Sequence, residues 1–220
     1  GRPDTVTMDK MAQAVKAGVH RISINPQTMN DQSLQRIGRN HTKKDVHQAF
    51  EIARTAGIKI INADIIAGLP GENTTDFAAT LDEILMLGPQ NVTVHSLAMK
   101  RASRLTGENS NFHHEQASVV AEMLTHGEET LACKGYLPYY LYRQKQMAGS
   151  LENVGYCLPG TENVYNIRIM EENQTIVAMG AGGISKAYYP GENRHERIPN
   201  VSNYEIYIER IEEMILRKEK

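Results

Sequence analysis

One acidic residue interrupts an apolar stretch of the chain, residues 62–72, NADIIAGLPGE. Isoleucines flank Asp64, so we expect its carboxylate to be largely desolvated and to need a partner. In one explanation the carboxylate forms a salt bridge or caps a neighbouring loop. In the other it accepts hydrogen bonds from ligand hydroxyls, such as those of a ribose. The position alone favours neither explanation.

A tight turn follows at residues 68–71, Gly-Leu-Pro-Gly, and leads into a helix that begins near Thr74. Such a turn places Pro at a corner with fixed φ and Gly where φ is positive. The junction can present free N–H groups to an anion. It is equally an ordinary loop between a strand and a helix.

Other polar residues lie in loops or at strand ends. Arg39, in the segment LQRIGRNH, can donate two hydrogen bonds to a carboxylate or a phosphate, although a solvated surface arginine is the commoner case. The first predicted strand runs into Asn-Pro-Gln at 25–27, and the third ends in His-Ser-Leu-Ala at 95–98. Ligands of parallel α/β sheets bind at these carboxyl ends.

Helices and strands alternate over the first hundred residues. Apolar periodicity and capping residues predict helices at 8–17, 30–36, 41–57 and 73–88, and β-branched runs predict strands at 19–25, 58–68 and 91–98. This order is typical of right-handed crossovers and a parallel sheet. The fold class is therefore α/β, with three (βα) units of a TIM-like barrel whose closure needs six or eight strands.

The pattern changes after residue 100. A long amphipathic helix is predicted at 113–135, strands at 136–147 and 173–189, and a closing helix at 202–220. We therefore predict two domains, a barrel portion at 1–100 and a smaller α+β domain at 101–220.

The composition excludes several classes of protein. The chain has 220 residues, 40% apolar and 23% charged, with a net charge of −2, so neither nucleic acid nor an anionic membrane is the expected partner. No apolar run approaches the ~20 residues of a membrane span. The two cysteines, Cys133 and Cys157, are isolated, which predicts small buried side chains, no metal site and a cytoplasmic location.

Taken together, the segments resemble a known family. GRPDT, AGVHRISINPQTMND, LQRIGRNHT, INADIIAGLPGE and NVTVHSLAMKR occur in this order. They are similar to the second half of the radical S-adenosylmethionine (SAM) barrel in the oxygen-independent coproporphyrinogen III oxidase family. YYLYRQKQMAGSLENVGYCLPGTENVYNI and TIVAMGAGGISK look like the C-terminal domain of the coproporphyrinogen dehydrogenase branch.

The resemblance implies a fold and a reaction. The fold is a partial (βα)6 barrel whose upstream half binds a [4Fe-4S] cluster through a CxxxCxxC loop. SAM cleaved at that cluster yields a 5′-deoxyadenosyl radical, which abstracts hydrogen from a propionate side chain of coproporphyrinogen III. Loss of CO2 and one electron then leaves a vinyl group, on the way to protoporphyrinogen IX. A reductant protein would supply electrons to the cluster.

The resemblance also implies the residues that contact SAM: Gln27, Arg39, Asp64, Ala98 and Ile184. Asp64 and Gln27 suit ribose hydroxyls or the methionine amino group, and Arg39 suits the methionine carboxylate. Arg21 and Arg143 are weaker candidates for contact with the substrate. No catalytic residue and no metal ligand is assigned in this chain.

The chain departs from the family pattern in one respect that matters. It contains no CxxxCxxC, so we expect it to be a C-terminal fragment that is inactive alone. Half a barrel leaves a sheet edge unpaired, which predicts a possible edge-to-edge dimer.

Two other functions stay open. Relatives of the oxidases share the barrel but bind and deliver haem, so a haem chaperone without dehydrogenase activity is one alternative. The other is a barrel enzyme that binds a phosphorylated metabolite at the GLPGE turn and works without iron.

Overall fold

The computed structural model describes residues 1–97, 117–142 and 152–219. Contacts within the chain divide it into two compact units, Gly1–Glu162 and Asn163–Lys220. The predictions for Ala98 and Arg143 lie outside the described residues.

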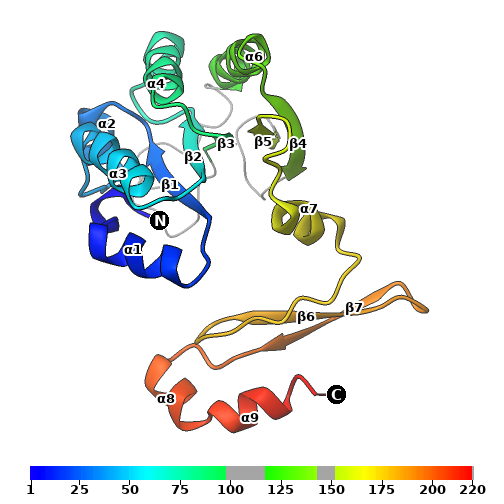
Figure 1. Cartoon of the computed structure of the whole chain (residues 1–220). Helices are drawn as coiled ribbons and strands as arrows, with labels where there is room; N and C mark the ends of the chain where they lie inside the picture. The colour runs from blue at the N-terminus through cyan, green and yellow to red at the C-terminus, as the bar shows by residue number, and fades with distance from the viewer. Residues whose placement is uncertain (98–116, 143–151, 220) are drawn as a thin grey trace. The chain divides into compact units, whose positions relative to one another are not determined.

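The first unit alternates helices with strands through Ser96, as predicted (Figure 1). Its helices are α1 (Met8–Lys16), α2 (Asp31–Arg36), α3 (Lys43–Thr55), α4 (Thr74–Met86) and α6 (Ala117–Cys133), with a 3₁₀ helix η1 at Pro3–Thr5. Its strands are β1 (Arg21–Gln27), β2 (Ile60–Ala67), β3 (Asn91–Ser96), β4 (Leu137–Tyr142) and β5 (Asn153–Cys157). The predicted N-caps Asn30 and Thr42 are confirmed, because both side chains accept hydrogen bonds from the first turn of their helices.

The strands form one five-stranded sheet in the order β1-β2-β3-β5-β4. β1, β2 and β3 are mutually parallel, which confirms the α/β class and the parallel sheet. β5 and β4 extend this sheet in antiparallel fashion. The chain beyond residue 100 therefore contributes to the first unit, and the boundary between compact units falls after Glu162 instead of after the predicted residue 100.

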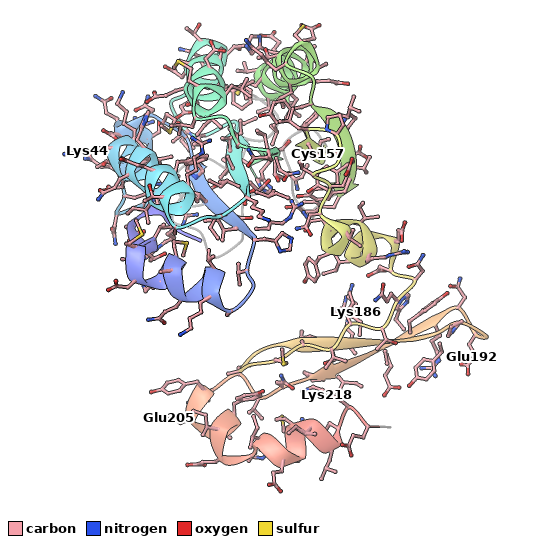
Figure 2. All side chains as sticks on the ribbon, viewed as in Figure 1. Lys44, Cys157, Lys186, Glu192, Glu205 and Lys218 are labelled. Atoms are coloured by element: carbon pink, nitrogen blue, oxygen red, sulfur yellow. The ribbon has the colours of Figure 1, made fainter. Side chains whose placement is uncertain are left out.

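One face of the sheet is apolar and packs against the helices. α3 contacts β1, α4 contacts β2, and α6 contacts both β2 and β3. Ile24 and Ile65 on the strands meet Phe50 and Leu81 on the helices in one buried cluster. Lys44, at the start of α3, points away from the sheet (Figure 2), so the helix is amphipathic as its periodicity predicts.

The opposite face of the same strands is polar. Side chains alternate along a strand, so the residues between the buried ones share this second face. We call it the polar face; it is made by Arg21, Ser23, Asn25, Asn62, Asp64, Asn91, Thr93, His95, Tyr140 and Tyr142. A sheet with this many polar groups on one face is suited to a ligand rather than to a second apolar layer.

A buried polar cluster joins the loops that follow β1 and β2. The Thr28 hydroxyl donates to Glu72 at 2.7 Å and lies 3.1 Å from the Thr80 hydroxyl on α4. Glu72 is only 6% exposed, and desolvation raises the pKa of its carboxyl above the usual value of 4.5. The last residue of GLPGE is therefore part of the scaffold of the turn.

The second unit is smaller and corrects two predictions. It contains α7 (Val164–Glu171), β6 (Ile184–Tyr189), β7 (Arg194–Pro199), α8 (Tyr204–Glu209) and α9 (Ile211–Leu216), with β6 and β7 antiparallel. The strand predicted over 173–189 is wrong before Ile184, because Gly180 and Gly182 take positive φ and break the extended chain. The single closing helix is wrong too, since Arg210 leaves helical geometry and separates α8 from α9.

No helix among the described residues is long and apolar enough to cross a membrane.

Replacing Gly68 by Ala is expected to destabilise the protein more than replacing Gly38 by Ala. Both glycines have positive φ, +85° and +70°, so both variants incur backbone strain of ~1–2 kcal/mol. Only at Gly68 would a new Cβ lie 2.6 Å from a side-chain atom, Cγ2 of Val120 on α6, whereas nothing lies within 4 Å at Gly38. Overpacking should add a further ~1–3 kcal/mol. Urea denaturation of both variants measures the difference, and equal losses would refute this packing.

Replacing Glu72 by Gln is expected to reduce the dependence of the unfolding free energy on pH. Because the pKa of Glu72 is raised in the folded protein, its protonated form stabilises the fold fully below about pH 4.5, and this contribution is lost as pH rises through the folded-state pKa. Glu72→Gln lacks that loss, so its stability relative to wild type should increase from pH 4.5 to 7. Denaturation at several pH values checks this, with the exposed Glu51→Gln as control; parallel pH curves would contradict it.

Candidate functional site

Two of the predicted ligand-binding residues lie at the carboxyl edge of the parallel strands. Gln27, the last residue of β1, pairs in register with Ile65 of β2, the neighbour of Asp64. On the other side, Asp64 pairs with Thr93 of β3. Gln27 and Asp64 therefore lie on adjacent strands at the same edge, as expected for a site at the carboxyl ends of a parallel sheet.

Asp64 has only part of its hydrogen-bonding capacity used by the protein. Its Oδ1 accepts a hydrogen bond of 2.6 Å from the Asn62 side-chain amide. Its Oδ2 lies 3.8 Å from Nε2 of His95, a distance too long for a direct hydrogen bond. Among the described residues no donor reaches Oδ2 directly. The carboxylate is thus oriented by a protein neighbour, while its second oxygen stays open to a ligand. Each of the two explanations offered for Asp64, a protein partner and a ligand hydroxyl, therefore accounts for one of its oxygens.

A chain of hydrogen bonds runs across the polar face on both sides of Asp64. The Thr93 hydroxyl donates to the side-chain oxygen Oδ1 of Asn62 at 3.1 Å and lies 3.2 Å from the Tyr140 hydroxyl. The Tyr142 hydroxyl lies 3.0 Å from Nδ1 of His95. The sequence interpretation missed Thr93 and these two tyrosines. The alternation of polar and apolar residues along these strands could have identified them, because it predicts one polar face instead of burial on both faces.

Tyr140 is held in this network by its packing. Its ring lies so close to Gly155 of β5 that any Cβ there would fall 1.8 Å from the ring. Burial raises the pKa of its phenol well above the ordinary value, so Tyr140 is a neutral hydroxyl and not a titrating group at neutral pH.

Gln27 has an unusual backbone. Its φ is +72°, the left-handed region, and the register of β1 against β2 shifts between Ile24 and Gln27. A non-glycine residue at positive φ costs about 1–3 kcal/mol and is concentrated at ligand-binding sites. Here the irregularity turns the end of β1. Gln27 is buried, with only 8% of its surface exposed.

Two further polar atoms at this edge are buried without a partner among the described residues. They are Oδ1 of Asn25 on β1 and Oγ of Ser96 on β3. A buried polar atom without a hydrogen bond costs about 1–3 kcal/mol. The unpaired Asn25 oxygen is on the polar face with Asp64 and fits a ligand rich in hydroxyl and amino groups, such as the nucleoside and methionine parts of SAM. Ser96 pairs with Ala67 and alternates onto the apolar face, so its hydroxyl is not beside Asp64.

Arg39 is tied to the same edge through His41. The ring of His41 is buried and its Nε2 lies 3.0 Å from the carbonyl oxygen of Pro26, the residue before Gln27. Arg39 itself is half-buried, and its guanidinium makes no hydrogen bond or ion pair with the described residues. Arg39 is thus two residues from a side chain that contacts β1, and its guanidinium is available for an anionic group.

Two other predicted residues lie elsewhere. Arg21, at the opposite end of β1 and about 20 Å from Gln27 along the strand, donates to Asn91 at 2.8 Å and to the carbonyls of Thr161 and Glu162 at 2.6 and 3.0 Å. Its guanidinium therefore has a structural role. Ile184 begins β6 in the second unit and is 49% exposed.

The start of α4, the anion site suggested by the GLPGE turn, is already capped. The Asn73 side chain accepts from the amides of Thr75 and Asp76, and the Asp76 carboxylate accepts from the Asn73 amide. The capping box thus occupies the amides of Asn73, Thr75 and Asp76, which leaves fewer N–H groups for a phosphate at this turn than the sequence suggested.

A groove of about 690 Å³ lies away from these residues. It is lined by Asp82, Leu85, Met86, Lys134, Tyr136 and Leu158. It contains none of the predicted site residues. Within the described part of the chain there is also no group of three or more His, Cys, Asp or Glu placed to hold a metal.

Comparison with known proteins supports the resemblance. Residues 2–84 match the radical SAM superfamily. The oxygen-independent coproporphyrinogen-III oxidase-like protein HemZ of Bacillus subtilis is 42% identical over 212 residues, which are 96% of this chain and 42% of that protein. The heme chaperone HemW of the same organism is 36% identical over 98 residues, 44% of this chain and 26% of that protein.

The fold agrees as well. The structure of coproporphyrinogen III oxidase (HemN) from Escherichia coli, a radical SAM enzyme, aligns with a TM-score of 0.63 at 17% identity over 96% of this chain and 48% of that one. The chain thus spans less than half the length of these relatives. The cofactors of the superfamily are SAM and a [4Fe-4S] cluster. The chain therefore belongs to the radical SAM superfamily, within the group of oxygen-independent coproporphyrinogen III oxidases and their relatives.

Proposed function

We propose that this chain supplies the SAM-binding carboxyl edge of an enzyme that oxidatively decarboxylates coproporphyrinogen III to protoporphyrinogen IX. The observation that carries the proposal is the gathering of Gln27, Asp64 and the Arg39 loop at one edge of the parallel strands. The 42% identity to an oxidase-like protein over 96% of the chain supports the reaction class.

Each residue has a chemical role in this proposal. The open Oδ2 of Asp64 accepts a hydrogen bond from a ligand hydroxyl or amino group, because Asn62 already occupies Oδ1. The free guanidinium of Arg39 pairs with the methionine carboxylate. The side chain of Gln27, turned by its positive φ, contributes a donor and an acceptor beside Asp64. Ala98 remains a proposed contact to adenine, and Ile184 remains a proposed contact to SAM.

The bound cofactors supply the radical chemistry: SAM cleaved at a reduced [4Fe-4S] cluster removes a hydrogen atom from a substrate propionate. This sequence has no CxxxCxxC, and its two cysteines are isolated, one exposed and one buried. We therefore propose that cluster ligands come from outside these 220 residues and that the chain alone is inactive. A reductant protein is a further proposed partner.

Substrate binding is proposed for Arg143, because a substrate with four carboxylates needs cations. Arg21 is the weaker of the two, since its guanidinium is engaged with three protein acceptors. The proposed edge-to-edge dimer would use β1, which is one of the two end strands of the described sheet.

A haem chaperone is the second candidate, favoured by the 36% identity to HemW over 98 residues. Titration with haem and assay with coproporphyrinogen III separate the two. Stoichiometric haem binding without turnover would select the chaperone.

Replacing Asp64 by Asn should weaken SAM binding about 10- to 100-fold, because a hydrogen bond to a charged group contributes about 1.5–3 kcal/mol. Isothermal titration with SAM measures the change, on a full-length protein that includes the cluster ligands and is loaded with its cluster. Asp82→Asn, on the exposed side of α4, is the matched control and should bind as wild type. Unchanged affinity in Asp64→Asn would remove the SAM assignment of this edge.

Replacing Arg39 by Ala should abolish the preference for SAM over decarboxylated SAM, because only the former presents a carboxylate to the guanidinium. Arg39→Lys should recover part of the preference, as it keeps the charge but not the planar pair of donors. Competitive titration with both ligands gives the ratio of affinities. A preference that survives Arg39→Ala would assign the carboxylate to another residue.

A further inference from the structure

His95 lies beside Asp64 on the polar face but has no assigned role. It belongs to β3, and its Nε2 is 3.8 Å from Oδ2 of Asp64 on β2. Both side chains are about one-fifth exposed, 22% and 18%. The pair is therefore partly shielded from water, yet reachable by a ligand at the carboxyl edge.

Tyr142 orients the imidazole of His95. Its hydroxyl lies 3.0 Å from Nδ1, and the two rings pack edge to face with centroids 6.1 Å apart. When the phenol donates to Nδ1, the proton of the neutral imidazole must reside on Nε2. The N–H of His95 is then directed to the side of the ring where Asp64 lies.

Asp64 is oriented from its other side. Asn62 donates to Oδ1 at 2.6 Å, and Asn62 itself is held by Thr93 and by Ser23. This leaves Oδ2 and Nε2 as an acceptor and a donor that face each other across 3.8 Å. The distance is too long for a direct hydrogen bond, but an oxygen placed between them can lie about 2.8 Å from both.

The chemistry of that gap selects one type of group. A hydroxyl can donate its proton to Oδ2 and accept the Nε2 proton at the same time. An ammonium group has protons but no lone pair, so it can satisfy Asp64 only. The pair therefore distinguishes between the two roles left open for Asp64, contact with a ribose hydroxyl and contact with the methionine amino group.

We propose that His95 and Asp64 together bind one ribose hydroxyl of the nucleoside part of the ligand, with Tyr142 as the residue that positions His95. This inference rests on the proposed function, because it requires SAM at the carboxyl edge. It adds a binding residue, a positioning residue and a selectivity for hydroxyl over ammonium.

The first test removes each partner of the bridge in turn. The full-length protein, which includes the cluster ligands and is loaded with its cluster, is titrated with SAM and with its 2′-deoxy and 3′-deoxy analogues. Wild type should bind one of the two analogues about tenfold more weakly than SAM. His95→Phe should bind SAM about tenfold more weakly, and its penalty for the same analogue should be smaller than in wild type, because only the Asp64 contact to the hydroxyl remains. His95→Gln, which keeps an N–H donor, should recover part of the affinity, and the exposed His47→Gln should match wild type.

The outcomes separate this inference from the proposed function. If Asp64→Asn weakens binding and His95→Phe does not, the bridge is refuted while SAM binding stands. If neither variant changes the affinity, the proposed function fails with it. If the analogue penalty in His95→Phe is as large as in wild type, the hydroxyl does not contact His95 and the inference is wrong.

The tautomer of His95 gives a readout that a purely structural role would not move. Long-range ¹H–¹⁵N spectra should show the proton on Nε2 in wild type and a mixture of tautomers in Tyr142→Phe. SAM should shift the Nε2 resonance in wild type. A proton on Nδ1, or an Nε2 resonance insensitive to saturating SAM, would overturn the assignment.

Discussion

The site depends on one constraint, a carboxylate held on a sheet face that is only partly exposed to water. Asp64 is stabilised by the Asn62 amide on one oxygen and lies near the His95 ring on the other. Such a group is costly unless its remaining hydrogen bonds are made. The polar face provides the orientation, and the carboxyl edge leaves one oxygen of Asp64 open. The apolar face of the same strands, packed on α3, α4 and α6, fixes the strand spacing and hence the distances between these side chains.

Much of this arrangement could be predicted from sequence because it is local. Capping residues such as Thr42 and turn glycines such as Gly57 mark helix ends through contacts with immediate neighbours. The order of elements then implies parallel strands, and parallel strands bring their carboxyl ends together. This is why Gln27 and Asp64 could be placed at one edge from the sequence alone, whereas their roles toward SAM came from the family resemblance and remain untested.

What could not be predicted depends on contacts between distant segments. Tyr142 reaches His95 only because β4 joins the sheet through β5, a connection that no local pattern encodes. The same pairing moves the boundary of the first compact unit to Glu162. Arg21 looked available as a cation, but its acceptors at Thr161 and Glu162 lie 140 and 141 positions further along the chain. In the second unit, glycines at positive φ ended a strand that β-propensity alone would have continued.

The central claim is that a nucleoside-bearing ligand binds at the carboxyl edge of β1, β2 and β3. Backbone amide chemical shifts recorded during titration with SAM test it most directly. Under this account the largest changes fall at residues 25–28, 39–41, 64–68 and 95–97, while the amino ends of the same strands near Arg21, Ile60 and Asn91 stay unchanged. Changes concentrated at those amino ends, or around the groove lined by Asp82 and Tyr136, would contradict it.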